Sequence, residues 1–364
     1  MEILLKENYQ EYEEYLQKND RAMFLQSTKW AKVKDLFINK IIIQRDKNGN
    51  INASMSVLIR KLPFLPYSIM YCPRGPVCDS NNKDILSSLL NDAKQLANQY
   101  NCYTLKLDPN IPKDDQEFIN IMKDLGCSIN FKGDSFSGSI QPSVVYHLSI
   151  NGRNSDELFS HFPYKTRYAI KSAIKSGIVI KKVGKEKLNE FYSLLLETSK
   201  RDHFTVRPIS YFEKMMDNLG QHLNLYIAYY ESIPISSAIL ISYGNRSLHL
   251  YGASSNLHRD KMPNYLMQWE MMNYAIENNI QIYDFGGIAA VQDQSNPLYG
   301  LFMFKRKFRG EVVEYVGEIE FILKPIINKI VNFAFNTRKK ILNIKKGKRN
   351  WKENYQKNNA KVEK

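Results

Sequence analysis

The sequence has few of the residues that build disulfide or metal frameworks. Its 364 residues include four cysteines and six histidines. The cysteines form no C-x-x-C pair, and no set of cysteines and histidines stands at the spacing that zinc sites use. We therefore predict no metal site and no bound cofactor, and a reducing, cytoplasmic environment.

Long apolar runs and familiar catalytic signatures are missing as well. No stretch of 18 uninterrupted apolar residues occurs, which argues against a membrane-spanning helix. The acidic, polar start of the chain argues against a secretion signal. Walker A, G-x-G-x-x-G, H-E-x-x-H and Ser/His/Asp patterns are absent. Asp284-Phe-Gly286 matches the kinase triplet by letters only, because the other kinase signatures are lacking.

What the chain does have is enough apolar sequence for real cores, and a surplus of positive charge. Hydrophobic residues make up 43% and charged residues 24% of the sequence, which excludes a disordered chain. At roughly 150 residues per domain, the length favours two domains. The net charge is +14, and residues 338–364 hold eleven Lys/Arg against two Glu. Most of the positive charge thus lies in a C-terminal tail.

The order of the predicted elements repeats along the chain, which predicts the α/β fold class with two similar units. In each half, helices are followed by antiparallel strands, a further helix and a strand. We place the units at residues 1–150 and 151–323. An amphipathic helix and the basic tail follow in residues 324–364. The apolar stripe of that helix is Ile326, Ile327, Ile330, Val331, Ala334 and Phe335.

Two polar segments follow strands in the first half. Tyr71-Cys-Pro-Arg-Gly-Pro-Val77 is a stiff turn, which is either a plain surface turn or a way to hold the Arg74 cation in a cleft. Asp108 ends the predicted strand Tyr103–Leu107, at a position where α/β sheets bind ligands. An Asp before a proline is also an ordinary turn signal, so both interpretations stay open.

Basic residues mark the second half. Arg167, Lys171 and Lys175 share one face of a predicted helix, which suits either a polyanion or plain solvation. Arg207 lies just before a predicted helix, where phosphate binds well. Further on, Lys305 stands among aromatic residues that would partly desolvate it, and such a lysine can stabilise a developing oxyanion.

Six motifs stand in order between about residue 25 and residue 322: Trp30-Ala-Lys-Val-Lys34, Tyr71-Cys-Pro-Arg-Gly-Pro-Val77, Leu248-His-Leu-Tyr251-Gly-Ala-Ser, Tyr265-Leu-Met-Gln-Trp-Glu, Tyr283-Asp-Phe-Gly-Gly-Ile288 and Leu301-Phe-Met-Phe-Lys305-Arg-Lys-Phe-Arg-Gly310. Together they resemble the FemABX family, the tRNA-dependent aminoacyltransferases that build the peptidoglycan interpeptide bridge. The resemblance implies two tandem acetyltransferase-like (GNAT) units around a shared substrate channel. Only Gly177–Glu186 separates two helices where some members insert a coiled-coil arm, so the chain resembles the compact, FemX-like type.

The resemblance also implies a substrate site. It assigns the diphosphate of the cell-wall precursor to Lys34 and Arg207, which are cations, as phosphate requires. The transfer centre is implied at Phe304 and Lys305, where the lysine stabilises the tetrahedral intermediate. The stem-peptide site is implied at four polar positions: Tyr103, Asp108, Tyr211 and Tyr251.

The implied reaction is attack by a stem-peptide amine on the ester of an aminoacyl-tRNA. The acceptor is lipid II or UDP-MurNAc-pentapeptide. An ester is already activated, so the enzyme has to align the amine, remove a proton and stabilise one negative oxygen. We leave the general base unassigned. We expect a monomer in the cytoplasm, with peripheral membrane contact where the acceptor is lipid-linked.

Alternatives to this function, and to the role of the tail, stay open. An acyl-CoA acetyltransferase needs a glycine-rich pyrophosphate loop, but the chain has His258-Arg-Asp-Lys-Met-Pro-Asn264 at that position. A non-catalytic RNA-binding protein would account for the net charge, although no common RNA-binding motif occurs. The C-terminal segment suits an anionic bilayer, packing on the second unit, or the tRNA backbone.

Overall fold

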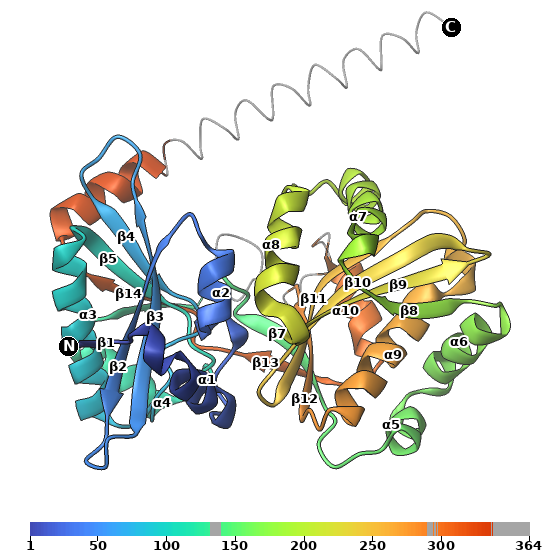
Figure 1. Ribbon diagram of the computed structural model, residues 1–364, viewed down its shortest axis with the longest axis horizontal. Helices are drawn as coiled ribbons and strands as arrows, with labels where there is room; N and C mark the ends of the chain where they lie inside the picture. Colours follow the sequence, from blue (N-terminus) through green and yellow to red (C-terminus); the bar gives the residue numbers. More distant parts are fainter. Residues whose placement is uncertain (132–139, 290–293, 295, 297, 336, 338–364) are drawn as a thin grey trace, which may run out of the picture.

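Two seven-stranded mixed sheets with flanking helices form the body of the molecule (Figure 1). The computed structural model describes residues 1–131, 140–289 and 298–335, together with residues 294, 296 and 337. The strand orders are β1-β2-β3-β4-β5-β14-β6 and β13-β7-β12-β11-β10-β9-β8. Neighbouring strands run antiparallel except for one parallel pair in each sheet, β4 with β5 and β11 with β12. The predicted α/β fold class is confirmed.

The bounds of the elements follow the chain. The strands are β1 (Glu2–Ile3), β2 (Ile38–Arg45), β3 (Ile51–Lys61), β4 (Ser68–Cys72), β5 (Cys102–Leu107), β6 (Ser128–Asn130), β7 (Val144–Ser149), β8 (Val179–Val183), β9 (Leu223–Tyr230), β10 (Ile233–Tyr243), β11 (Arg246–Ser254), β12 (Ile282–Gly287), β13 (Glu311–Glu314) and β14 (Glu318–Ile322). The helices are α1 (Tyr9–Lys18), α2 (Thr28–Val33), α3 (Lys83–Gln99), α4 (Gln116–Asp124), α5 (Ser155–His161), α6 (Tyr164–Lys175), α7 (Leu188–Asp202), α8 (Ile209–Leu219), α9 (Pro263–Glu277) and α10 (Tyr299–Arg306). Residues 325–335 form a further helix.

The two sheets do not follow the boundaries expected from the sequence. β7 lies in the unit expected at residues 1–150, but it pairs with β12 and β13 in the second sheet. β14 lies in the unit expected at 151–323, but it fills the gap between β5 and β6 in the first sheet. Each sheet is thus completed by a strand from the other stretch of sequence. Sequence patterns miss this exchange because it depends on long-range pairing.

Local signals place the helices that carry the candidate site. Ser27 caps α2, since its hydroxyl accepts a hydrogen bond from the backbone N–H of Trp30 at 3.1 Å. The α2 helix is short and buries Trp30 and Val33, so its end is held firmly against the core. Lys34 follows as the C-cap residue of this anchored helix.

The two units share a hydrophobic core. Phe24 and Trp30 from the first unit belong to the same buried cluster as Phe191 and Phe212 from the second. At the edge of this seam, Tyr243 donates a hydrogen bond to Glu13 at 2.8 Å. A shared core of this kind fixes how the two units are placed relative to each other.

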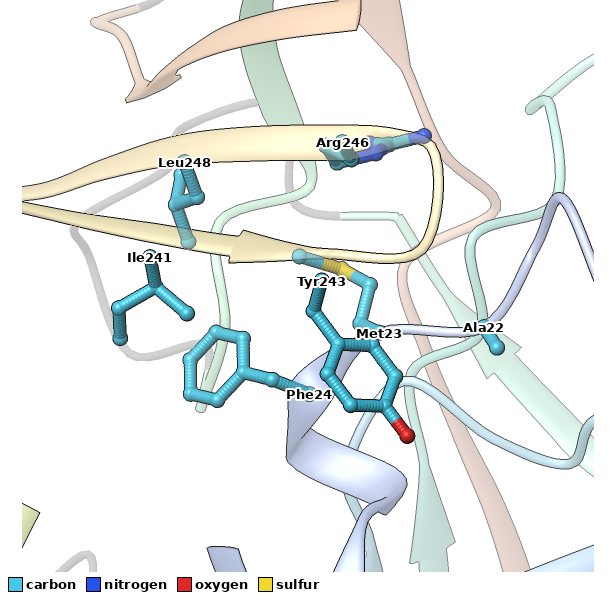
Figure 2. Close-up of a pocket in the computed structure, with 7 residues that line it drawn as sticks. All are labelled: Ala22, Met23, Phe24, Ile241, Tyr243, Arg246 and Leu248. Carbon is cyan, nitrogen blue, oxygen red and sulfur yellow. The ribbon is translucent and has the colours of Figure 1, made fainter. Parts of the chain in front are cut away.

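A small cavity lies on the seam, beneath the β10–β11 hairpin (Figure 2). Its volume of about 10 Å³ suffices for about one water molecule. We interpret it as a packing gap and not as a substrate pocket. Its lining is Ala22, Met23, Phe24, Ile241, Tyr243, Arg246 and Leu248.

The C-terminal helix lies against the first sheet. The backbone N–H groups of Leu323 and Lys324 both donate to the carbonyl of Tyr103 on β5. The open alternative of packing on the second unit is therefore wrong for residues 325–335, because β14 carries the chain back to the first sheet. The basic tail from residue 338 onward lies outside the described residues. Among the described helices, none combines the length and the apolar character needed to cross a bilayer.

Candidate functional site

Two cations meet at the seam between the units. Lys34 Nζ, at the end of α2, donates a hydrogen bond to the Tyr211 hydroxyl on α8 at 3.1 Å. The same Nζ lies 4.6 Å from the centre of the Trp30 ring, and the exposed guanidinium of Arg207 lies 5.5 Å from the centre of the Tyr211 ring. Within the part of the chain that the structure describes, neither cation has a carboxylate partner. Two unpaired cations around one tyrosine make a site suited to an anion.

The electrostatics of this cluster also favour an anion. Burial lowers the pKa of Lys34 to about 8, and repulsion from Arg207 acts in the same direction. Burial raises the pKa of Tyr211, so its hydroxyl stays protonated and able to donate. Tyr251 on β11 lies beside Tyr211 in the same cluster and packs against Phe212, with 5.1 Å between ring centres. Four of the predicted residues are therefore brought together: Lys34, Arg207, Tyr211 and Tyr251.

Asp108 is buried and already partnered. Its carboxylate accepts hydrogen bonds from the Tyr71 hydroxyl at 2.6 Å and from the Arg74 backbone N–H at 2.7 Å. Burial raises the pKa of Asp108 to about 6, against the attraction of Arg74. The Arg74 guanidinium donates to the carbonyl of Pro142 and lies 5.0 Å from the centre of the Tyr315 ring. Arg74 in this turn thus contacts two segments of the second unit: Pro142, just before β7, and Tyr315, just after β13.

Tyr103 is not brought to the other predicted residues. It stands near the start of β5, whereas Asp108 follows the end of the same strand. Five residues of strand separate the two backbones by roughly 16 Å. The Tyr103 side chain is 3% exposed, and burial raises the pKa of its hydroxyl to about 12. Its surroundings are those of a core residue beside the C-terminal helix.

Lys305 is a buried cation on α10. Its side chain is 5% exposed, and its Nζ donates a hydrogen bond to the Gly287 carbonyl at 2.7 Å. Gly286 has a φ of 75°, a left-handed conformation that glycine adopts without strain and that shapes the backbone leading to this carbonyl. Burial lowers the pKa of Lys305 to about 8, while attraction to Asp284 opposes the change. Phe304 packs beside it against Tyr265, with ring centres 5.2 Å apart.

The position of Lys305 coincides with a parting of two parallel strands. β11 and β12 pair only from Arg246–Leu248 to Ile282–Asp284, although both strands continue further. On its other edge β12 pairs with β7, from Ile282 to Asp284 and again at Gly287. The carboxyl ends of parallel strands are where α/β sheets bind ligands. The Gly287 carbonyl that holds Lys305 thus lies at the type of position that binds ligands in other α/β sheets.

A buried charge network supports Lys305, and the sequence patterns missed most of it. Asp284 lies 3.2 Å from Nε2 of His147 and 3.5 Å from Nη1 of Arg246. Burial alone would raise the pKa of Asp284, but His147 and Arg246 together hold it well below its usual range. Arg246 also donates to the Tyr315 hydroxyl at 3.1 Å. His147, Arg246 and Tyr315 are far apart in the sequence, so no local motif indicates this network.

His249 is a second residue that the sequence patterns missed. Its Nδ1 lies 3.0 Å from the amide nitrogen of Gln268. Burial, together with repulsion from Lys305, lowers its pKa to about 4, so the imidazole is neutral at physiological pH. Within the described structure, its Nε2 has no hydrogen-bond partner. A single histidine between two leucines gives no sequence signal that its side chain is buried close to Lys305.

The basic helix α6 lies next to the end of α10. The Thr166 hydroxyl donates to the carbonyl of Lys307 at 2.8 Å. Arg167 folds back and donates to the carbonyl of Phe162, so it does not join the predicted stripe. Lys171 and Lys175 remain exposed on the outer face. The rings of Tyr164 and Tyr168 stack on the same helix and are exposed.

Comparison with known proteins places this geometry in a family. The model of the FemAB family matches residues 8–232 and 229–336. The lipid II:glycine glycyltransferase of Staphylococcus aureus (strain MRSA252) is 30% identical, over 88% of this chain and 93% of that protein. A protein of the same name from Staphylococcus epidermidis (strain RP62A) is also 30% identical, with the same coverage.

Solved structures agree with these matches. The crystal structure of FemX superposes with a TM-score of 0.85 at 28% identity, covering 91% of this chain and all of that one. A tandem GNAT protein from the clavulanic acid biosynthesis pathway has a TM-score of 0.54 at 11% identity, over 88% of this chain and 97% of that one, which shows the fold alone. The expected tandem acetyltransferase-like fold and the expected transferase of the FemABX type are confirmed. The chain belongs to the FemAB family.

Proposed function

We propose that this chain transfers an amino acid from aminoacyl-tRNA to the stem peptide of a peptidoglycan precursor. The observation that carries the proposal is the pair of unpaired cations, Lys34 and Arg207, in a molecule that also holds the buried Lys305. The names of the relatives specify lipid II, which favours lipid II over UDP-MurNAc-pentapeptide as the acceptor. Both acceptors carry a diphosphate, which two cations in different units can bind from two sides.

The acceptor is bound across the seam in this proposal. Lys34 and Arg207 contact the diphosphate, and the hydroxyls of Tyr211 and Tyr251 lie beside them to orient the sugar or the peptide. Asp108 does not contact the acceptor directly. Its carboxylate instead fixes Tyr71 and the Arg74 turn. Tyr103 supports the first sheet and has no part in binding.

Lys305 serves the transfer itself. The acceptor amine attacks the ester carbonyl, a C–N bond forms, and the carbonyl electrons move onto the oxygen. One Nζ proton of Lys305 is held by the Gly287 carbonyl, which aims the cation and leaves its other protons for that oxygen. Collapse of the intermediate breaks the bond to the tRNA ribose oxygen, and this oxygen takes up a proton equivalent to the one that the attacking amine gives up. Phe304 and Tyr265 keep water from this point.

Aminoacyl-tRNA approaches from the second unit. The exposed lysines Lys171 and Lys175, with the exposed rings of Tyr164 and Tyr168, lie on a helix that touches the end of α10. Cations contact the phosphates of RNA, and tyrosine rings stack with bases. We place the enzyme in the cytoplasm as a monomer, in peripheral contact with the membrane that holds a lipid-linked acceptor.

The rival function is acyl transfer from CoA. In GNAT enzymes the pyrophosphate lies on free backbone N–H groups at the start of a helix. Here α9 starts at Pro263, which has no N–H, and the N–H of Tyr265 already donates to Met262. These features disfavour CoA at that position.

Reconstitution with purified components tests the proposal. The enzyme is incubated with lipid II and with tRNA charged with one radiolabelled amino acid at a time, without CoA. We expect label in the lipid fraction for at least one amino acid. A parallel reaction receives labelled acetyl-CoA in place of charged tRNA. If only that reaction yields a modified product, the chain is an acyl-CoA transferase. Binding of tRNA with no product from any donor would indicate a non-catalytic RNA-binding protein.

A further inference from the structure

Apolar side chains project into solvent at one end of the first sheet. At the tip of the β3–β4 turn, Phe64 is fully exposed and Leu65 is 42% exposed. On the C-terminal helix, Ile326 and Phe333 are each 74% exposed, and Ile330 between them is 54% exposed. The spacing of the last three puts them on one helical face. The opposite side of the helix is buried through Val331 and Asn328. The apolar stripe expected from the sequence is therefore divided, with Val331 buried and Ile326 and Ile330 exposed.

The turn and the helix are neighbours in space. Lys324, just before the helix, donates to the side chain of Asn101 and lies 5.4 Å from the centre of the Tyr67 ring. Asn101 in turn donates to the carbonyl of Pro66 in the β3–β4 turn. Figure 1 shows the turn and this helix together at the top of the first unit, whereas α10 lies in the second unit. Five exposed apolar side chains thus occur at one end of the molecule.

Exposed cations stand next to these side chains along the chain. Arg60 and Lys61 are the last residues of β3, just before the turn, and Lys329 lies on the C-terminal helix. The chain that continues from this helix, residues 338–364, holds eleven Lys/Arg against two Glu. Apolar side chains bordered by cations are complementary to a bilayer interface, which has apolar acyl chains beneath anionic headgroups.

We propose that this end of the first sheet docks on an anionic lipid bilayer. Phe64 and Leu65 from the turn, and Ile326, Ile330 and Phe333 from the helix, enter the interface. The described cations Arg60, Lys61 and Lys329 contact lipid headgroups. A tRNA backbone needs the cations but gives no role to five exposed apolar side chains. The docking face is separate from the transfer centre, and it rests on the proposed function in that it supplies the surface for the membrane contact placed there.

Vesicle sedimentation of the full chain tests the docking face. Vesicles of phosphatidylcholine alone are compared with vesicles that contain 30% phosphatidylglycerol. We expect binding mainly to the anionic vesicles. The double variants Phe64→Ser/Leu65→Ser and Ile330→Ser/Phe333→Ser should each weaken it at least tenfold, because each loses two apolar side chains. All charges are retained, so the loss is not electrostatic. The matched control is Ile233→Ser/Leu257→Ser, which removes two exposed apolar side chains from the second unit and should bind as the parent does.

Further measurements decide the remaining outcomes. Thermal melting shows whether each variant is folded, and a Phe64→Trp variant reports insertion through quenching by brominated lipids. Unchanged vesicle binding in both double variants, or no quenching of the tryptophan, would overturn the proposal. So would a loss of tRNA affinity with unchanged vesicle binding, which assigns the surface to RNA. A dimer in sedimentation equilibrium that the double variants dissociate would assign it to a second copy of the chain.

Discussion

Lys34 and Lys305 share a pKa lowered to about 8, but their surroundings differ. Lys34 lies at the seam, where the second cation, Arg207, repels it. Lys305 lies inside the second unit, where Asp284 attracts it and the Gly287 carbonyl holds it. Burial lowers both pKa values, whereas the neighbouring charges act in opposite directions.

This difference separates two tasks. A site with net positive charge and no anionic partner binds a permanent anion, such as a diphosphate, with both cations. A lysine that a nearby carboxylate attracts and a backbone carbonyl already holds has less to gain from a ground-state anion. Such a lysine is suited to stabilise a negative charge that exists only in the transition state. An interaction that is absent from the ground state lowers the activation barrier and does not merely tighten substrate binding. The predictions below test this division.

The largest effect is expected at Lys305. Lys305→Met keeps much of the packing and removes the charge, so kcat should fall about 100- to 1000-fold, equivalent to about 2.7–4 kcal/mol. The KM for the precursor should change little, since the lost interaction forms in the transition state. Steady-state kinetics on charged tRNA and precursor measures both. A normal kcat would exclude Lys305 from the mechanism.

A smaller effect is expected at the seam. Lys34→Met and Arg207→Ala should each raise the KM for the precursor roughly 10- to 100-fold, because a charge-assisted hydrogen bond is worth about 1.5–3 kcal/mol. The KM for aminoacyl-tRNA should stay close to that of the parent. Lys214→Ala is the control, since Lys214 lies on α8 and already pairs with Asp35. Equal changes in both KM values would contradict the assignment to the precursor.

The pH dependence sharpens the comparison. A lowered pKa means that each lysine is charged below pH 7 and loses its proton as the pH rises through about 8. Precursor affinity, measured by calorimetry, should therefore fall above that pH because of Lys34, and the single-turnover rate at saturating substrates should fall because of Lys305. Lys34→Arg keeps its charge and should flatten only the affinity profile. An affinity profile that keeps its shape in this variant would assign the titration to another group.

Sequence patterns reached the fold class because it rests on local periodicity. In α2, Trp30 and Val33 stand three residues apart and are both buried, and β4 is a short, mostly apolar run; both are patterns that the sequence shows locally. The exchange of β7 and β14 between the sheets was not predictable in this way, because each strand is equally apolar whichever sheet it joins.

The candidate site shows the same limit. Resemblance indicated Lys34, Arg207, Tyr211 and Tyr251, which the fold brings together from both units. It also indicated Tyr103, whose place near the start of β5 separates it from the others. The network around Asp284 went unrecognised, because its members come from different strands and carry no shared motif. The roles of all these residues remain predictions for the kinetics above.

The smallest effect is expected on α6, where both lysines are exposed and contact only the donor substrate in our proposal. Lys171→Ala/Lys175→Ala should raise the KM for aminoacyl-tRNA about fivefold and leave the precursor KM unchanged. Because two phosphate contacts are lost, the dependence of log affinity on log salt should become shallower by about 1.5. Lys83→Ala/Lys94→Ala removes two exposed lysines from α3 in the first unit and serves as the control. If both double variants keep the parental salt dependence, the α6 lysines are a solvated face, and the tRNA reaches the transfer centre by another surface.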